Sequence, residues 1–194
     1  MGDNGDPMVH RRTITYEVST DDSTMRVDGH LVDERPWADG TEVRSLQHDL
    51  FLRVAIGLAD LVITEAAIEM RAFPHTECPE IEPAFAGLVG VSVGRGFTKE
   101  VQRRVAGVHG CTHLDQVARG LGPAVMQSLT SHKARQRVHA TTPADYTPSP
   151  WVLGTCHIWE PGGIAQQKLE AGWSPGRGEY PAPALVELRR RNSR

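Results

Sequence analysis

The chain has 194 residues, of which 39% are hydrophobic and 23% charged. This composition excludes a disordered polyelectrolyte, and no apolar run approaches the roughly 20 residues that a membrane-spanning helix needs. The net charge of −3 excludes the excess of Lys and Arg that is typical of nucleic-acid-binding domains. We therefore expect neither a membrane nor a nucleic acid as partner.

The N-terminal residues 1–10 are polar and acidic, and they lack the basic and then apolar pattern of a secretory signal. They predict a disordered leader and a cytoplasmic protein. Three cysteines in a chain without an export signal argue against a disulfide framework, and they favour thiol chemistry or metal ligation.

The length fits one α+β domain, which we place at residues 11–160. A loop-rich extension follows over residues 161–194, with a short helix predicted at 185–191. The arginines at 189–191 and 194 are interpreted as a solvated helix end, with binding of an anionic partner as the alternative. A homo-oligomer is compatible with this organisation.

Two β segments are predicted near the N-terminus. Residues 13–18 alternate between apolar and polar side chains, the period of a half-buried strand. Residues 25–32 predict a short hairpin, because Asp28-Gly29 is a preferred type I′ turn sequence. A loop is expected over residues 34–40.

The most regular pattern predicts a long central hairpin. Residues 46–58 place Leu46, His48 and five further apolar side chains on one face of a strand, and residues 61–73 fold back on it. A tight turn near Ala59-Asp60 would set His48 opposite the region of Arg71. We expect His48 to point inward with the apolar face.

Helices dominate after Cys78. The pattern predicts a short helix or turn at 79–85, a glycine-punctuated connection at 87–96, and a helix at 98–105. A longer helix begins at Thr112, with Asp115 completing a capping box, and Gly122-Pro123 should kink or interrupt it. A polar segment at 140–150 and a last strand at 151–159 follow.

The densest group of reactive side chains is His109-Gly-Cys-Thr-His113. Cys111 and His113 would lie at the N-terminus of the long helix, where unpaired backbone N–H groups and the helix dipole favour a thiolate. Cys111 then serves as a nucleophile or ligand, and His113 as a ligand or general base. The alternative is that Cys111 simply packs beneath the turn.

A metal site is the second hypothesis for these residues. Cys78, Cys111, His113 and His48 together would satisfy a tetrahedral zinc or thiolate-bound iron site, if the fold brings them together. His48 is alternatively a buried structural histidine or a proton carrier. Cys156 is a further ligand or a small core residue. No glycine-rich nucleotide-binding motif is present, so no nucleotide cofactor is expected.

Several short blocks resemble a known family. His48-Asp-Leu, Cys78, Leu88-Val-Gly90, Gly110-Cys-Thr-His-Leu114 and Thr155-Cys-His157 resemble the bacterial domain of unknown function 2889, over roughly residues 12–160. The order of strands, Cys78, helix and Cys111 is also similar to iron–sulfur scaffold proteins of the NifU and SufE type. That second resemblance implies that Cys78 and Cys111, with His113 beside them, gather metal or sulfur.

Three functions are compatible with this sequence. The first is a small-molecule enzyme, a lyase, isomerase or hydrolase, whose catalytic residues Cys111, His113 and His48 form a Cys/His metal site or an activated thiolate. The second is a noncatalytic carrier or scaffold for metal or iron–sulfur clusters. The third is a structural module in which these Cys and His residues are merely packed.

Overall fold

The computed structural model describes residues 8–35, 45–138, 152–173 and 181–193. It divides into two compact units, residues 1–129 and 130–194. The predicted leader at 1–7, most of the loop at 34–40 and the segment at 140–150 lie outside the described residues.

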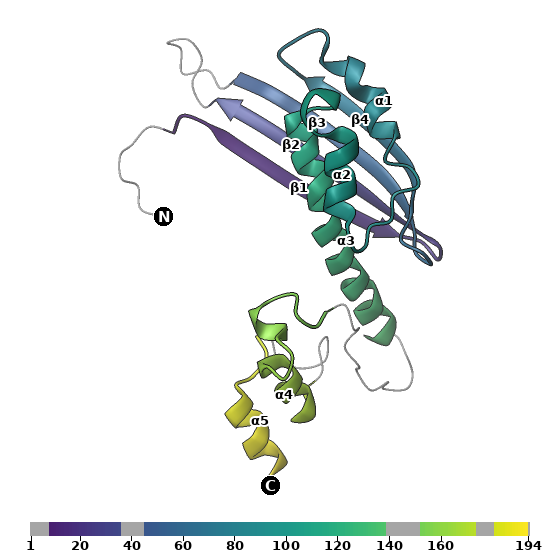
Figure 1. Cartoon of the computed structure of the whole chain (residues 1–194). Coiled ribbons are helices and arrows are strands. Elements are labelled where there is room, and N and C mark those ends of the chain that lie inside the picture. Colours follow the sequence, from purple (N-terminus) through teal and green to yellow (C-terminus); the bar gives the residue numbers. More distant parts are fainter. Residues whose placement is uncertain (1–7, 36–44, 139–151, 174–180, 194) are drawn as a thin grey trace. The chain divides into compact units, whose positions relative to one another are not determined.

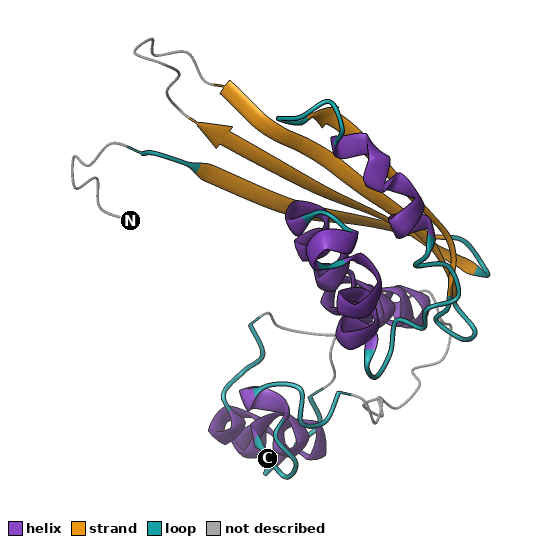
Figure 2. Ribbon diagram, turned by 45° about the horizontal axis from the view of Figure 1, so that its top comes forward, coloured by secondary structure: helices purple, strands orange, loops and turns teal. Residues whose placement is uncertain are grey.

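The first unit is α+β. Its sheet is antiparallel, with strands in sequential order: β1 (Arg11–Thr20), β2 (Thr24–Arg35), β3 (Ser45–Gly57) and β4 (Ile63–Ala72). The helical elements that follow are η1 (Cys78–Ile81), α1 (Glu82–Ala86), α2 (Phe97–Val105), η2 (Gly107–His109) and α3 (Thr112–Val138). Figures 1 and 2 show α1, α2 and α3 on the same face of this sheet.

The central hairpin of β3 and β4 confirms the sequence prediction. Leu50 pairs with Met70 and Ile56 with Ile63, and bulges after Asp49 and Ala55 shift the register. Asp49 therefore pairs with Ala72. The register of His48 is thus shifted by about two residues along β4 from the predicted position opposite Arg71. Leu50, Leu52, Val54 and Ile56 are buried on the helix-covered face.

The hairpin predicted at Asp28-Gly29 is wrong. Both residues lie inside β2, and Gly29 pairs with Tyr16 of β1. The actual turn follows β1, and Asp21 Oδ1 accepts hydrogen bonds from the backbone N–H groups of Ser23 and Thr24. A side chain at position 29 would have its Cβ 2.5 Å from Val117 Cγ1, so this glycine permits close packing of α3 on the sheet.

The core of the first unit lies between the sheet and the helices. Its buried members run from Met25 to Leu129, and the stripe predicted on α3 supplies Leu114, Val117, Leu121 and Val125. This helix continues through Pro123 without the predicted interruption. Asp115 forms an ion pair with Arg119 and leaves Oδ1 without a hydrogen bond, so the predicted capping box does not form.

The second unit contains η3 (His157–Trp159), α4 (Ile164–Glu170) and α5 (Leu185–Asn192). The strand predicted at 151–159 is wrong for its described part, since residues 152–159 form turns and η3. Helix α4 lies in a segment predicted to be loop, whereas α5 confirms the terminal helix. Among the described residues, no helix is both long and apolar enough to cross a bilayer.

Candidate metal centre

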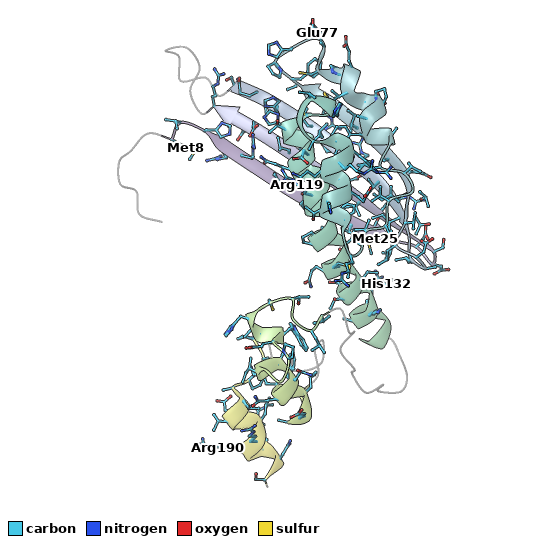
Figure 3. All side chains as sticks on the ribbon, viewed as in Figure 1. Met8, Met25, Glu77, Arg119, His132 and Arg190 are labelled. Carbon is cyan, nitrogen blue, oxygen red and sulfur yellow. The ribbon has the colours of Figure 1, made fainter. Side chains whose placement is uncertain are left out.

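The candidate site lies at the end of the sheet where β1 and β3 begin and β2 ends. Met8, just before β1, marks this end, and Met25 marks the opposite one (Figure 3). Here β2 contributes Asp33 and β3 contributes His48, which are directly paired across the two strands. The N-terminus of α3 supplies His113.

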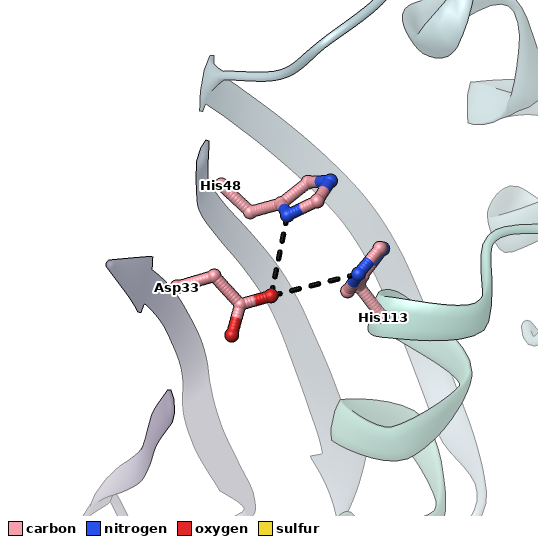
Figure 4. A group of neighbouring side chains, drawn as sticks. All are labelled: Asp33, His48 and His113. Carbon is pink, nitrogen blue, oxygen red and sulfur yellow. Dashed lines mark ion pairs between the residues drawn. The ribbon is translucent and has the colours of Figure 1, made fainter. Parts of the chain in front are cut away.

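Asp33 is the centre of this cluster. Its side chain is only 2% exposed, and Oδ2 lies 3.2 Å from His48 Nδ1 and 3.5 Å from His113 Nε2 (Figure 4). One ligand atom from each of the three residues lies within 4.8 Å of the other two. This is the one such Asp, Glu, His or Cys group found in the described part of the chain.

The two histidine rings pack against each other. Their centroids are 3.7 Å apart and their planes are inclined by 31°. His48 Nδ1 is buried and, although it is close to Asp33 Oδ2, the alignment is too poor for a hydrogen bond. A buried ring nitrogen without a hydrogen bond is costly unless some further group satisfies it.

Arg12 and His10 hold the other side of the carboxylate. Arg12 Nε donates to Asp33 Oδ1 at 2.7 Å and Nη2 donates to Oδ2 at 2.6 Å, while Nη1 donates to Gln116 Oε1 at 2.9 Å. His10 Nε2 lies 3.1 Å from Oδ1. The two parallel hydrogen bonds from Arg12 fix the plane of the Asp33 carboxylate.

Burial and charge set the protonation of the cluster. Burial lowers the pKa of His48 and of His113, and Asp33 only partly opposes this effect. Burial would raise the pKa of Asp33, but the hydrogen bond and charge of Arg12, with His10 and His113, lower it. The directions favour an ionised Asp33 beside two neutral imidazoles.

Cys111 adjoins this cluster but is not part of it. Its Sγ lies 3.6 Å from His113 Nδ1, and its backbone oxygen accepts the first hydrogen bond of α3, from Asp115. The thiol is half-buried and packs against the core. Since His113 directs Nε2 towards Asp33, a hydrogen bond from Nδ1–H to Cys111 leaves the Nε2 lone pair available.

The expected ligand set is therefore assembled only in part. His48 and His113 are brought together, but Cys78 begins η1 and belongs to no potential ligand group among the described residues. Cys156 is exposed in the second unit, so its interpretation as a core residue is wrong. Two surface hollows, of about 590 Å³ on α5 and 310 Å³ on β2–β4, contain none of the cluster residues.

Asp33 is the residue that sequence reasoning missed. It continues the buried alternation of Met25, Val27 and Leu31 on β2, so a carboxylate on an apolar strand face was the available signal. The mistaken turn at Asp28-Gly29 ended the predicted strand before that position. His10 and Arg12 likewise continue the inward alternation of Ile14 and Tyr16.

The comparison with protein families matches one continuous segment of the chain, which contains the cluster. The family described as protein of unknown function (DUF2889) matches residues 10–127. The chain belongs to the DUF2889 family. Every residue of the cluster lies within the DUF2889 segment, as do Cys111 and Gln116. Comparisons with curated proteins and with solved structures found no match.

Proposed function

We propose that Asp33, His48 and His113 bind a divalent transition metal, zinc or iron, in an enzyme that acts on a small molecule. The observation that carries this proposal is the approach of three ligand atoms to within 4.8 Å of one another. Metal–ligand bonds of about 2.1 Å place tetrahedral ligands about 3.4 Å apart. The separations from Asp33 Oδ2, 3.2 and 3.5 Å, match that value.

The protonation states also suit a metal. Imidazoles bind metal ions as neutral bases, and both histidines have pKa values lowered by burial. Asp33 has a lowered pKa and offers a charged oxygen. A metal bound at His48 Nδ1 would supply the partner that this buried atom lacks.

Three protein ligands favour a catalytic over a structural centre. Structural zinc sites usually have four protein ligands, whereas two histidines and a carboxylate leave coordination positions for substrate or water. A metal bound here would act as a Lewis acid and increase the acidity of bound water. Hydrolase, lyase and isomerase reactions all use this chemistry.

Cys111 has a supporting role in this proposal. A neutral His113 with its proton on Nδ1 would donate it to this sulfur, 3.6 Å away, and the ring would then direct Nε2 towards the metal position. Partners of this kind typically change metal affinity by about 10- to 100-fold. This role replaces the expectation that Cys111 and Cys78 are direct ligands.

A second candidate function is thiol catalysis. Cys111, His113 and Asp33 form a chain, with Cys111 Sγ 3.6 Å from Nδ1 and Asp33 Oδ2 3.5 Å from Nε2 of the same ring. Such an order of nucleophile, base and orienting carboxylate is found in cysteine hydrolases. A carrier of metal or iron–sulfur clusters, as the resemblance to NifU and SufE implies, would instead need Cys78 as a ligand.

The decisive experiment measures metal binding by tag-free protein, using calorimetry with Zn²⁺ and Co²⁺ and elemental analysis. We expect one metal per chain, and at least a hundredfold weaker binding in Asp33→Asn, His48→Ala and His113→Ala. His109→Ala is the matched control, because His109 is exposed just before α3 and lies outside the ligand group. Equal binding by His113→Ala and His109→Ala would refute the proposed centre.

Substitution of the cysteines separates the two candidates. For the metal enzyme, Cys111→Ser should retain one metal with about 10- to 100-fold weaker affinity, and Cys78→Ser should bind like the wild type. For thiol catalysis, iodoacetamide should modify Cys111 much faster than the exposed Cys156, and His113→Ala should abolish that difference. Loss of metal in Cys78→Ser would instead favour the carrier.

A further inference from the structure

We infer that this centre takes an anionic substrate and holds its oxyanion group, a carboxylate or a phosphate, between the metal and Arg12. The inference rests on the proposed function and specifies its substrate class. Three observations carry it: the charge balance around Asp33, the hydrogen-bonding capacity left on Arg12, and the position of His10.

The charge balance is the first observation. Asp33 and Arg12 neutralise each other through a bidentate ion pair, and histidines bind a metal as neutral imidazoles. A divalent cation would give this buried cluster a net charge of about +2, which is costly in a poorly solvated site. An anion bound beside the metal would offset that charge.

Two carboxylates close in sequence to the histidines are engaged elsewhere. Asp115, on the same helix as His113, already pairs with Arg119. Asp49 follows His48 on β3 but pairs with His30, whose ring stacks on Phe51 on the other face of the strand. A bound anion would supply the compensating charge that these two carboxylates do not.

Arg12 retains the capacity to bind such a ligand. Three of its five N–H groups make hydrogen bonds, two to Asp33 and one to Gln116. The remaining two N–H groups, on Nη1 and Nη2, make none within the described structure, and the side chain is 31% exposed. A guanidinium edge next to a metal position suits a bidentate oxyanion.

His10 lies at the rim of the same site. Its side chain is 47% exposed, while its Nε2 reaches Asp33 Oδ1 at 3.1 Å. It can therefore contact both the buried carboxylate and a ligand that enters from solvent. Arg12 lies in β1 and His10 just before this strand, two residues away, so both would face the same side of a bound anion.

The test uses the full chain loaded with Co²⁺, whose visible absorption bands respond to changes in coordination. Acetate, benzoate and inorganic phosphate are titrated separately at constant ionic strength, with perchlorate as the weakly coordinating control. We expect saturable one-to-one binding either of the carboxylates acetate and benzoate or of phosphate. The class of anion that binds more tightly identifies the oxyanion group of the substrate. The perchlorate control should give no saturation.

Arg12→Gln should weaken binding of the preferred anion by about tenfold or more while one Co²⁺ remains bound. The matched control is Arg11→Gln, since Arg11 is the exposed neighbour on β1 and should bind the anion like the wild type. Arg12→Lys keeps the charge but loses the planar fork, and we expect intermediate affinity. Circular dichroism verifies that each variant is folded.

The outcomes separate this inference from the proposed function. If Co²⁺ binds but no anion saturates, or if Arg12→Gln and Arg12→Lys bind the anion as tightly as wild type, the oxyanion inference is wrong and the metal centre stands. If no metal binds, both fail. Should neither Arg12 variant fold, the wild-type titration decides alone, and the absence of saturation overturns the inference.

Discussion

At the residue scale, Tyr16 shows how single side chains join the sheet to α3. It lies opposite Gly29 on β2, and its hydroxyl donates a hydrogen bond to the backbone oxygen of Val117 at 2.9 Å. Gly120, one turn further along α3, leaves the space that the tyrosine hydroxyl occupies. Two glycines and one tyrosine therefore set the distance between helix and sheet.

This packing predicts that Gly29→Ala and Gly120→Ala both destabilise the first unit. The added methyl group would overlap Val117 in one case and Tyr16 in the other, and overpacking of this kind typically costs about 1–3 kcal/mol. Gly94→Ala is the control, because a Cβ there would make only an ordinary contact with Ser92. Urea denaturation measures the free energy of unfolding, and equal values for Gly29→Ala and Gly94→Ala would contradict the prediction.

The protonation of the cluster predicts the pH dependence of stability. Burial lowers the pKa of His48 and His113 in the folded chain, below the value of about 6.5 of the unfolded chain. The unfolded state therefore binds more protons, and stability is greatest above pH 6.5 and is lost as the pH falls through that value. Asp33, whose pKa is also lowered, contributes in the same direction, and its contribution to stability is lost as the pH falls below about 4.

Urea denaturation of the metal-free chain at pH 7.5, 6.5 and 5.5 checks this dependence. We expect the free energy of unfolding to fall across the series, and to fall less in His48→Gln, which cannot be protonated. His109→Gln should retain the wild-type slope, because His109 is exposed. A slope in His48→Gln as steep as in the wild type would assign the dependence to other groups.

At the level of single elements, the alternation of apolar and polar residues located the strands well, whereas the turn-like dipeptide Asp28-Gly29 led to a wrong prediction. The alternation of residues 46–58 identified β3 and placed His48 on the inner face, and its contacts with Asp33 and His113 confirm both. The dipeptide Asp28-Gly29 has the composition of a turn, yet the glycine serves close packing against Val117. Local composition cannot distinguish these uses of glycine, because the second depends on a helix almost 90 residues later.

Helix α3 supplies both the core and His113, so its apolar stripe should carry much of the stability. Leu121→Ala, at a fully buried position, should lower the free energy of unfolding by about 2–5 kcal/mol. Gln102→Ala on α2 is exposed and should change it by less than about 0.5 kcal/mol. Both values come from urea denaturation, and a cost below 1 kcal/mol for Leu121→Ala would exclude a rigid packing role for this stripe.

At the scale of the whole molecule, the candidate centre belongs entirely to the first unit. The DUF2889 match spans residues 10–127, and the main buried core runs from Met25 to Leu129. In the part of the chain that the structure describes, the hydrogen bonds and ion pairs of Asp33 involve residues 10–127. The described members of this core and of the cluster all belong to the first unit.

A chain that ends after residue 138, at the end of α3, should therefore fold and bind metal like the full chain. We expect the same stoichiometry and a dissociation constant within about threefold, measured by calorimetry with Zn²⁺. Asp33→Asn in the same truncated chain is the control for specific binding. A folded fragment that binds no metal would show that the second unit contributes to the centre.

Local periodicity and residue chemistry were enough to predict the α+β class, the central hairpin and the apolar stripe of α3, and to single out His48 and His113 as candidates. Which of these groups meet depends on the three-dimensional fold. Asp33 and Arg12 join the histidines because β1, β2 and β3 align their inward faces at one end of the sheet, and His10 lies just before β1 at the same end. Cys78 stays outside because convergence of distant ligands depends on strand register and helix placement, which short-range pattern does not encode.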